Sequence, residues 1–423
     1  MTQDGLLSLK RCLQGSSLPV PRRLSDPVRP TKKLAVLGST GSIGTQSLEV
    51  ARDEGFEVVS LAAGRNVEKL AEQIALFKPA FVSVLDEDVR TSLVRRLVEL
   101  DVSCPDIGVG RSGVVRAARW DDADTVVAAI TGFAGLEPVL AAAASGKKIA
   151  LANKEALVVA GHAVMRLASD SGALILPVDS EHSAIWQCLM ASFPSDLHHV
   201  ILTCSGGPFF GRTRDEMNDV SVEEALAHPT WSMGEKITVD SATLMNKAFE
   251  LIEACHLYGL EPENVRIVVH PQSLVHSLVA FKDGSCLAQV GTPDMRIPIR
   301  YALTFPSRSD CFDRTPFDLF DGSENKTWTF ANVDEETFPS LRLAREVWCD
   351  GGLMPLVFNA SNEAAVRLFL DGAIQLTQIF DFVERALDEF RHMSSIEALS
   401  FDDMMDGHHR VLRRVRTYAH TTP

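Results

Sequence analysis

The stretch Lys33-Leu34-Ala35-Val36-Leu37-Gly38-Ser39-Thr40-Gly41-Ser42-Ile43-Gly44 decides the fold class of this chain. Its first five residues are a short apolar run, and the glycines behind them have a GxxGxxG spacing before a helix-like stretch at 45–52. Glycines in such a turn allow close backbone approach, so the N-terminus of the helix can hold a pyrophosphate. Glycine-rich turns also occur for purely structural reasons, but the place of this one in the first strand–turn–helix unit favours a dinucleotide site.

Strand-like and helix-like segments alternate after this turn. Apolar runs at 58–63, 81–85, 125–130, 148–152 and 174–178 are separated by segments with helical spacing at 67–77, 136–144 and 155–169. This alternation predicts an α/β fold with a Rossmann-type, doubly wound parallel sheet. Beyond residue 178, shorter runs at 200–203, 267–270, 274–281 and 285–290 lie between polar, glycine-containing loops. They predict a second, central α/β unit with a smaller, mixed sheet.

At 423 residues the chain is too long for one hydrophobic core, so several domains are expected. We expect a flexible N-terminal extension at 1–30, an NADPH-binding Rossmann domain at 31–178, a central catalytic domain at 179–306, a linker at 307–338 and a C-terminal α-helical domain at 339–423. In the last of these, a stripe at three- and four-residue spacing predicts an amphipathic helix packed on a core. Its members are Phe401, Met404, Met405, His408, Leu412 and Val415.

The composition limits the function classes. A net charge of −15 disfavours nucleic acid and anionic membrane surfaces as partners, and no apolar run approaches the roughly 18 residues of a membrane span. The eight cysteines are scattered without a CxxC pair, which predicts reduced thiols of a cytoplasmic protein. The basic, proline-containing first thirty residues suggest a flexible tail or a start codon placed too early; an organellar transit peptide is the alternative.

The end of the second predicted strand indicates the nicotinamide cofactor. An NAD enzyme usually has Asp or Glu there to bind the ribose 2′-hydroxyl. This chain has Ala62-Ala63-Gly64-Arg65-Asn66, without an acid and with an arginine. Because a guanidinium suits a 2′-phosphate, the sequence predicts NADPH.

Two acidic groups suggest a metal site. Asp179 and Glu181 follow an apolar strand, and at a period of two they project to the same side. An exposed acidic loop explains that pair equally well. The segment 240–250 adds an acid, Glu250, on a predicted helix with Asp240 or Ser241 near its N-cap. Carboxylate ligands without clustered Cys or His select Mg²⁺ or Mn²⁺ over zinc.

Other polar residues suggest a phosphate site and a mobile loop. The small-residue loop 204–208 can present backbone N–H groups and a hydroxyl to an anion, and Ser241, Asn246 and Lys247 could complete the site. Such a loop alone is usually only a turn. The segment 228–234 places His228 and Trp231 between Pro and Gly, as in a lid. Packing of Trp231 in a core is the alternative.

Nine motifs together resemble the 1-deoxy-D-xylulose-5-phosphate reductoisomerase family, in its order, over about 260 residues. They are LGSTGSIG (37–44), AAGRN (62–66), LANKEALV (151–158), LPVDSEH (176–182), SGGPF (205–209), HPTWSMG (228–234), TVDSATLMNKAFELIEA (238–254), HPQSLVHS (270–277) and GTPDMR (291–296). NEAAV (362–366) in the predicted helical tail is also similar to the family.

The resemblance implies site residues position by position. NADPH-binding positions match Thr40, Gly41, Ser42, Ile43, Gly64, Arg65, Asn66, Asn153, Glu155, Gly234 and Met295. Metal-ligand positions match Asp179, Glu181 and Glu250. Substrate positions match Lys154, Ser180, Glu181, Ser205, His228, Trp231, Ser241, Asn246, Lys247 and Glu250, and catalytic roles fall to Lys154, Glu181 and His228.

The resemblance also implies the reaction. The divalent cation, Mg²⁺ or Mn²⁺ and also Co²⁺, would chelate substrate oxygens, and a retro-aldol/aldol rearrangement of 1-deoxy-D-xylulose 5-phosphate would precede reduction by NADPH to 2-C-methyl-D-erythritol 4-phosphate. This is a step of non-mevalonate isoprenoid biosynthesis. A homodimer built through the central domain is a further family expectation.

Two other functions stay open from the residues alone. A plain NADPH-dependent dehydrogenase of a small phosphorylated aldehyde or polyol explains the glycine turn, but gives Asp179, Glu181 and Glu250 no joint purpose. A non-catalytic nucleotide-sensing Rossmann protein needs neither the metal cluster nor the Trp231 loop. Metal-dependent turnover of NADPH separates the three hypotheses.

Overall fold

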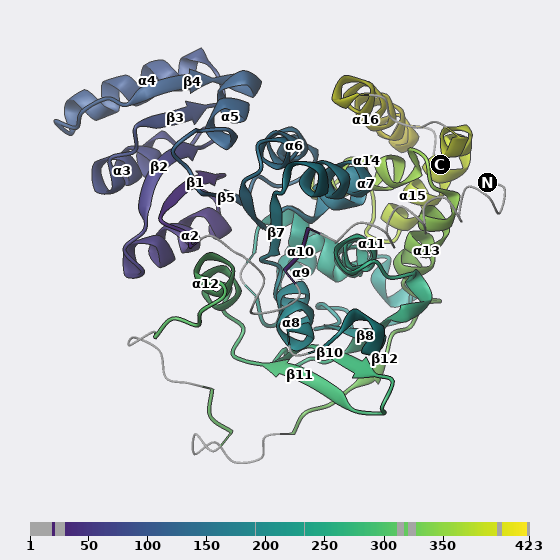
Figure 1. Ribbon diagram of the computed structural model, residues 1–423. Helices are drawn as coiled ribbons and strands as arrows, with labels where there is room; N and C mark the ends of the chain where they lie inside the picture. Colours follow the sequence, from purple (N-terminus) through teal and green to yellow (C-terminus); the bar gives the residue numbers. More distant parts are fainter. Residues whose placement is uncertain are drawn as a thin grey trace.

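The computed structural model describes residues 19–21, 30–190, 192–231, 233–310, 317–319, 327–395 and 400–420. Figure 1 shows three parts: a parallel sheet with its helices, a second sheet at the bottom of the view, and a group of helices at the C-terminal end. Most of the predicted extension at 1–30, and part of the predicted linker at 307–338, lie outside the described residues.

The first sheet is parallel throughout, with the strand order β4-β3-β2-β1-β5-β6-β7. Its strands are β1 (Lys33–Leu37), β2 (Glu57–Ala62), β3 (Phe81–Val84), β4 (Asp106–Val109), β5 (Thr125–Ala128), β6 (Lys148–Leu151) and β7 (Leu174–Pro177). The inner strands are apolar because helices cover both faces. The prediction of a doubly wound parallel sheet is confirmed.

The helices of this part are α2 (Ser42–Asp53), α3 (Val67–Phe77), α4 (Glu87–Glu99), α5 (Gly110–Ala118), α6 (Leu136–Ala144) and α7 (Lys154–Ser171), with the 3-10 turn η1 (Phe133–Gly135). Of these, α3 and α6 begin and end at the predicted residues. The region of α4, β4 and α5 was not predicted, because α4 buries only Val89, Leu93 and Leu97 among many charged residues, and β4 is short and only partly buried.

The topology locates a ligand crevice. Strand β1 pairs with β2 on one side and with β5 on the other, so successive crossovers leave it in opposite directions. In doubly wound sheets the crevice at the carboxyl ends of such strands is where ligands bind. The glycine turn after Leu37 lies at this switch point.

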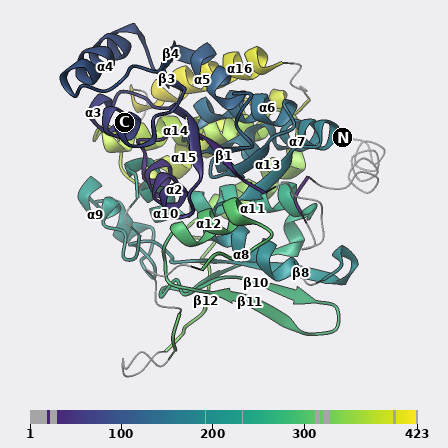
Figure 2. The same ribbon diagram turned by 60° about the vertical axis from the view of Figure 1, so that its left-hand side comes forward.

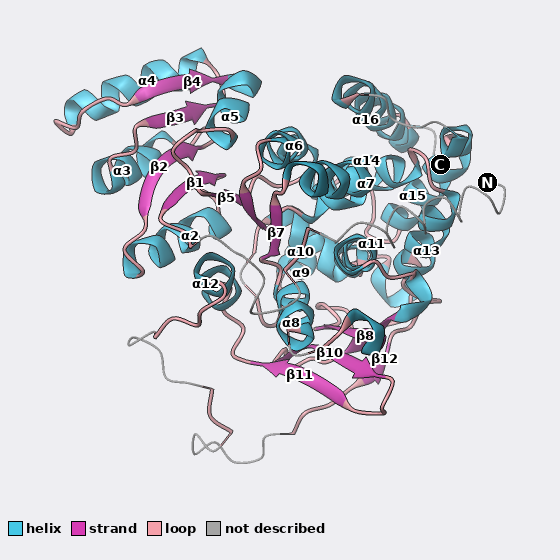
Figure 3. Ribbon diagram, in the orientation of Figure 1, coloured by secondary structure: helices cyan, strands magenta, loops and turns pink. Residues whose placement is uncertain are grey.

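The second sheet is mixed and has the order β11-β10-β8-β9-β12 (Figure 3). Its strands are β8 (Leu197–Cys204), β9 (Val265–Val269), β10 (Val275–Phe281), β11 (Cys286–Val290) and β12 (Ala331–Asn332). Only the β8–β9 pair is parallel. The accompanying helices are α8 (Ser180–Leu189), α9 (Val222–Leu226), α10 (Glu235–Ala242), α11 (Met245–Tyr258) and α12 (Arg296–Thr304), with η2 (Pro194–Asp196), η3 (Asp215–Met217) and η4 (Pro262–Asn264).

The C-terminal part is helical, as predicted. It contains α13 (Ser340–Asp350), α14 (Met354–Leu370), α15 (Gln378–Glu389) and α16 (Phe401–Arg416), with η5 (Arg391–Ser395) and η6 (Tyr418–His420). Helix α14 is buried along most of its length between its neighbours. Helix α16 lies toward the top of Figure 2, and Asp402 in its first turn forms an ion pair of 2.9 Å with Arg111 of α5. Among the described helices, none combines the length and apolar character needed to cross a membrane.

Three residues of the N-terminal extension, 19–21, pack against the folded chain. The Ile175 amide of β7 donates to the Pro19 carbonyl at 2.7 Å, and the Trp186 indole donates to the Pro21 carbonyl at 2.7 Å. Val20 between them is buried. This segment therefore covers the free edge of β7, which reduces the exposure of unpaired backbone groups.

Candidate active site

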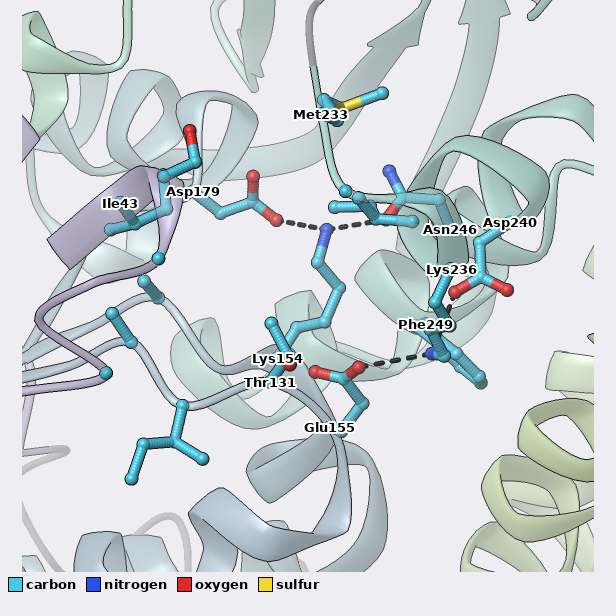
Figure 4. Close-up of a pocket in the computed structure, with 18 of the residues that line it drawn as sticks. Ile43, Thr131, Lys154, Glu155, Asp179, Met233, Lys236, Asp240, Asn246 and Phe249 are labelled. Carbon is cyan, nitrogen blue, oxygen red and sulfur yellow. Dashed lines mark hydrogen bonds and ion pairs between the residues drawn. The ribbon is translucent and has the colours of Figure 1, made fainter. Parts of the chain in front are cut away.

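A single cavity of about 1280 Å³ is lined by residues from all three parts of the molecule. Its walls come from the crevice of the first sheet, from α8, α10 and α11, and from the cavity-facing side of α16. Figure 4 shows part of this cavity, with Ile43 on one side, Lys236 and Phe249 on the other, and Lys154 and Thr131 between them.

The turn 38–44, here called the cofactor turn, is built from backbone. The amides of Gly38 and Ser39 donate to the Ala62 carbonyl at 2.8 and 2.9 Å, and Gly38 has a φ of +81°. A Cβ at Gly44 would overlap the Gly38 carbonyl oxygen, so only glycine fits at that position. Gly41 is the N-cap of α2 and has no side chain to cap it, so the first amides of the helix are available to an anion.

The predicted cofactor residues fall into two groups. Seven of them line the cavity: Gly41, Ser42, Ile43, Gly64, Glu155, Gly234 and Met295. Thr40, Arg65, Asn66 and Asn153 lie outside that lining. Arg65 forms an ion pair of 2.9 Å with Asp86 on the exposed side of the crevice.

The two asparagines outside the lining support the backbone. The Asn66 side chain caps α3 by accepting from the Lys69 amide at 3.1 Å. The Asn153 side chain caps α7 by accepting from Ala156 at 2.7 Å, and it donates to the Gly132 carbonyl at 2.9 Å. Asn153 therefore fixes the loop after β5 that lines the cavity.

Asp179, Glu181 and Glu250 come together, with one oxygen of each within 4.8 Å of the others. The backbone geometry that brings them together differs from the prediction. The chain is not extended at 179–181, because β7 ends at Pro177 and Asp179 is the N-cap of α8. The period-two argument was therefore wrong, since helix geometry at the start of α8 directs Asp179 and Glu181 to Glu250 of α11.

Two buried lysines complete this group, here called the carboxylate–lysine centre. Lys154 Nζ lies 2.5 Å from Asp179 Oδ2, 3.1 Å from Glu250 Oε1 and 2.8 Å from Asn246 Oδ1. Lys247 Nζ lies 2.8 Å from Glu181 Oε1 and also contacts Glu250 Oε2. Three segments, the start of α7, the start of α8 and helix α11, thus share one set of charges (Figure 4).

Burial and charge act against each other in this centre. Burial and the neighbouring Glu181 raise the pKa of Glu250 to about 7. Burial also opposes ionisation of Glu181, but the Lys247 ammonium outweighs it and lowers the pKa of Glu181 to about 2. Burial would lower the pKa of Lys154, yet Asp179 and Glu250 outweigh it and hold that pKa well above its ordinary value.

The centre fits a divalent cation. Three carboxylate groups from two helices converge on one point, and Glu250 is fully buried. Buried carboxylates need a positive charge nearby, which Lys154 and Lys247 supply in part. An all-oxygen donor set matches a hard cation such as Mg²⁺.

Of the predicted phosphate and substrate residues, Asn246 and Lys247 belong to this centre, and the others lie beside it. Ser205, His228, Ser241, Asn246 and Lys247 all line the cavity. The Gly207 amide donates to Ser205 Oγ at 3.1 Å, which shapes the loop after β8. Hydroxyl, amide and ammonium groups from three segments can thus hold one anion.

His228 has a defined tautomer. Its Nδ1 accepts from the amides of Thr230 at 3.1 Å and Trp231 at 2.9 Å, so Nε2 carries the proton and donates to Ser205 Oγ at 3.0 Å. Burial lowers the pKa of His228, which favours this neutral form. Trp231, Met233 and Gly234 of the same loop line the cavity, so Trp231 is not part of the core.

One local prediction was wrong. Asp240 and Ser241 do not begin a helix; they lie in the last turn of α10, and α11 starts at Met245. The break falls at Leu244, which has a φ of +55°. A non-glycine residue in that conformation is not visible in sequence patterns, so the two helices were taken as one.

Further residues of the cavity wall were not predicted. Thr131, Lys236, Asp240 and Phe249 line it, although Lys236 lies only two residues after the predicted loop. The stripe on α16 was predicted to pack, and its members Met404, His408 and Val415 are indeed buried. Phe401, Met405, His408 and Leu412 also line the cavity, so α16 serves both purposes. The wide apolar stripe gave no sign of a second role.

The cavity joins an anion-binding helix N-terminus to a cluster of oxygen ligands, as in dinucleotide-dependent enzymes that use a divalent cation. Family models for 1-deoxy-D-xylulose 5-phosphate reductoisomerase match residues 34–161, and two models for its C-terminal domains match residues 175–258 and 290–413. The chain belongs to the 1-deoxy-D-xylulose 5-phosphate reductoisomerase family.

Individual relatives agree with this family. The 1-deoxy-D-xylulose 5-phosphate reductoisomerase of Symbiobacterium thermophilum is 50% identical over 84% of this chain and 92% of its own length. That of Agathobacter rectalis is 46% identical over 89% of this chain and 96% of its own.

Solved structures of the family agree as well. A crystal structure of DOX-P reductoisomerase in complex with NADPH, fosmidomycin and magnesium has 39% identity and a TM-score of 0.85, covering 92% of this chain and 98% of that one. The Zymomonas mobilis enzyme in complex with NADPH has 38% identity and a TM-score of 0.84, covering 93% and 100%.

Proposed function

We propose that this chain converts 1-deoxy-D-xylulose 5-phosphate to 2-C-methyl-D-erythritol 4-phosphate, using NADPH and a divalent cation. The observation that carries the proposal is the convergence of Asp179, Glu181 and Glu250 in the same cavity as the cofactor turn. Relatives named 1-deoxy-D-xylulose 5-phosphate reductoisomerase match 84% to 89% of the chain. The reaction is an intramolecular rearrangement by retro-aldol and aldol steps, followed by reduction.

Asp179, Glu181 and Glu250 would hold the cation, which supplies Lewis-acid polarisation of substrate oxygens when bound. Lys154 presents an ammonium group at the same point and stays charged, so it can stabilise negative charge that develops on a substrate oxygen. Asn246 orients that ammonium through its 2.8 Å contact.

The phosphate end would be held away from the reacting carbons. Ser205, Ser241, Asn246 and Lys247 line the adjoining wall, and His228 keeps the Ser205 hydroxyl in place. Anchoring the phosphate uses binding energy at a non-reacting group to fix the rest of the substrate. Trp231 in the neighbouring loop would exclude water from the reacting end.

The cofactor would lie along the cofactor turn, with its pyrophosphate at the N-terminus of α2. Arg65 at the end of β2 would hold the 2′-phosphate, and Gly234 and Met295 would contact the cofactor from the other wall. A plain dehydrogenase or a nucleotide sensor would leave the carboxylate–lysine centre without a purpose.

The first test is NADPH consumption with 1-deoxy-D-xylulose 5-phosphate in Mg²⁺ and in EDTA, followed by the absorbance of NADPH. Oxidation that needs the cation and yields methylerythritol phosphate is expected. A folded, NADPH-binding protein that stays inactive on this substrate in Mg²⁺, Mn²⁺ and Co²⁺ would contradict the proposal.

We also propose a homodimer in the cytoplasm. Strand β11 is an edge of the second sheet with Leu287 exposed on it, and pairing of this edge with another copy would cover both. The described cysteines are free thiols, which supports a reducing compartment. Light scattering after size exclusion tests the dimer, and fractionation of the source cells tests the location.

A further inference from the structure

Lys236 joins two buried carboxylates across the cavity wall. It lies in the first turn of α10, and its Nζ is 3.1 Å from Glu155 Oε1 and 2.8 Å from Asp240 Oδ2. The same ammonium lies over the Phe249 ring, 4.9 Å from its centroid. Figure 4 shows both ion pairs, with Glu155 below Lys154 and Asp240 on the far side of Lys236.

The partners of Lys236 are buried, so the ion pairs cannot be replaced easily by water. Glu155 is 8% exposed and Asp240 is 2% exposed. A carboxylate in such a place needs a cation, and removing that cation leaves an uncompensated buried charge. Burial opposes ionisation of Glu155, but Lys236 outweighs it and lowers the pKa of this carboxyl.

Asp240, the second partner of Lys236, is itself held by a residue of the C-terminal helices. Asp240 Oδ1 accepts from Asn362 Nδ2 at 2.7 Å, and Asn362 is a fully buried residue of α14. A continuous chain of polar contacts therefore runs from Asn362 through Asp240 and Lys236 to Glu155. It connects α14, α10 and the start of α7.

These polar contacts join the N-terminal ends of α10 and α7, and both ends carry predicted cofactor residues. Glu155 directly follows Lys154 and lines the cavity. Gly234 is the N-cap of α10 and lines the cavity two residues before Lys236. The ion pair between Lys236 and Glu155 connects these two walls directly.

We propose that Lys236 is a positioning residue for cofactor binding, which holds the Glu155 carboxylate and the N-terminus of α10 in place and is itself held by Asp240 and Asn362. This proposal depends on the proposed function in one respect only, namely that NADPH binds in this cavity. Lys236 need not contact substrate or cation, so its effect should be confined to the cofactor.

The test measures the NADPH Kd by fluorescence in the absence of sugar phosphate. Lys236→Met is expected to weaken NADPH binding about tenfold, within the usual coupling between linked sites. Lys33→Met is the matched control, because Lys33 also faces two carboxylates, Glu57 at 3.7 Å and Asp122 at 3.6 Å. Lys33 begins β1, whereas the cofactor turn follows the other end of that strand. The NADPH Kd of this control variant should stay within about twofold of wild type.

A double-mutant cycle separates positioning from general stability. Glu155→Gln should weaken NADPH binding about fivefold in the wild type and less than about twofold in Lys236→Met, because the pair is already broken. Additive effects of the two substitutions, or an unchanged Kd in Lys236→Met, would overturn the proposal. Wild-type protein that shows no metal-dependent turnover would contradict the proposed function instead, since this cycle uses binding alone.

A remote variant keeps the test decisive if Lys236→Met does not fold. Asn362→Leu removes the contact to Asp240 at a residue outside the cavity lining, and should raise the KM for NADPH about threefold while the KM for the sugar phosphate stays unchanged. Lys236→Arg keeps the charge and should retain binding within about threefold. An Asn362→Leu variant with wild-type KM values for both ligands would overturn the proposal.

Discussion

The cofactor turn and the carboxylate–lysine centre share one cavity but are built in opposite ways. The cofactor turn uses backbone amides and the absence of side chains at Gly38, Gly41 and Gly44. The carboxylate–lysine centre uses five buried or partly buried ionisable side chains that meet only after α7, α8 and α11 have packed. A backbone site is therefore sensitive to added atoms, whereas a charged site is sensitive to a lost or reversed charge.

The largest expected effect is at the charged site. Asp179→Asn removes one cation ligand and the partner of Lys154 at 2.5 Å, so turnover should fall about 1,000-fold or more. The NADPH Kd should stay within about twofold, because Asp179 lies outside the cofactor turn. Steady-state rates and fluorescence titration measure the two quantities. Near-normal turnover would refute the ligand assignment, and EDTA on the wild type should reproduce the loss.

The matching change at the backbone site should separate the two regions. Gly44→Ala places a methyl group on the Gly38 carbonyl oxygen, so the cofactor turn must open and NADPH binding should weaken about 100-fold. Cation binding, followed by Mn²⁺ titration, should be unchanged. Gly291→Ala is the control, because its Cβ would have no neighbour closer than 3.5 Å. If both variants bind NADPH equally well, the turn is not the cofactor site.

The comparison also explains what the sequence could predict. The cofactor turn is local, so its role follows from residues 33–44, which contain both the turn and the strand before it. Within the charged site, the acidic pattern suggested Asp179, Glu181 and Glu250 as a metal site, and the resemblance to a family assigned them as ligands, while the extended geometry inferred for Asp179 and Glu181 was wrong. Lys236 was missed because its partner Glu155 is 81 positions away, and Asn362, which holds its other partner Asp240, is 122 positions from Asp240, so only tertiary packing brings these residues together. The predicted domain boundaries at 178 and 306 stay predictions.

A smaller effect is expected where the cofactor site depends on one charge. Arg65→Glu should weaken NADPH binding about 30-fold and NADH binding less than about threefold, because only NADPH carries the 2′-phosphate. In the structure Arg65 pairs with Asp86 at 2.9 Å, so the introduced acid also faces another acid. Competition of both cofactors in one titration measures the ratio. An equal loss for both cofactors would remove the argument for Arg65.

The smallest effect should come from a cap beside the cofactor turn. Asn66 lies outside the cavity lining, and its side chain accepts from the Lys69 amide at the start of α3. Asn66→Ala should therefore lower the free energy of unfolding by about 1 kcal/mol, while the NADPH Kd changes less than about threefold. Chemical denaturation and fluorescence titration of the same preparation give both values. A large loss of affinity with unchanged stability would mean that Asn66 binds the cofactor directly, and the backbone description of this region would then be incomplete.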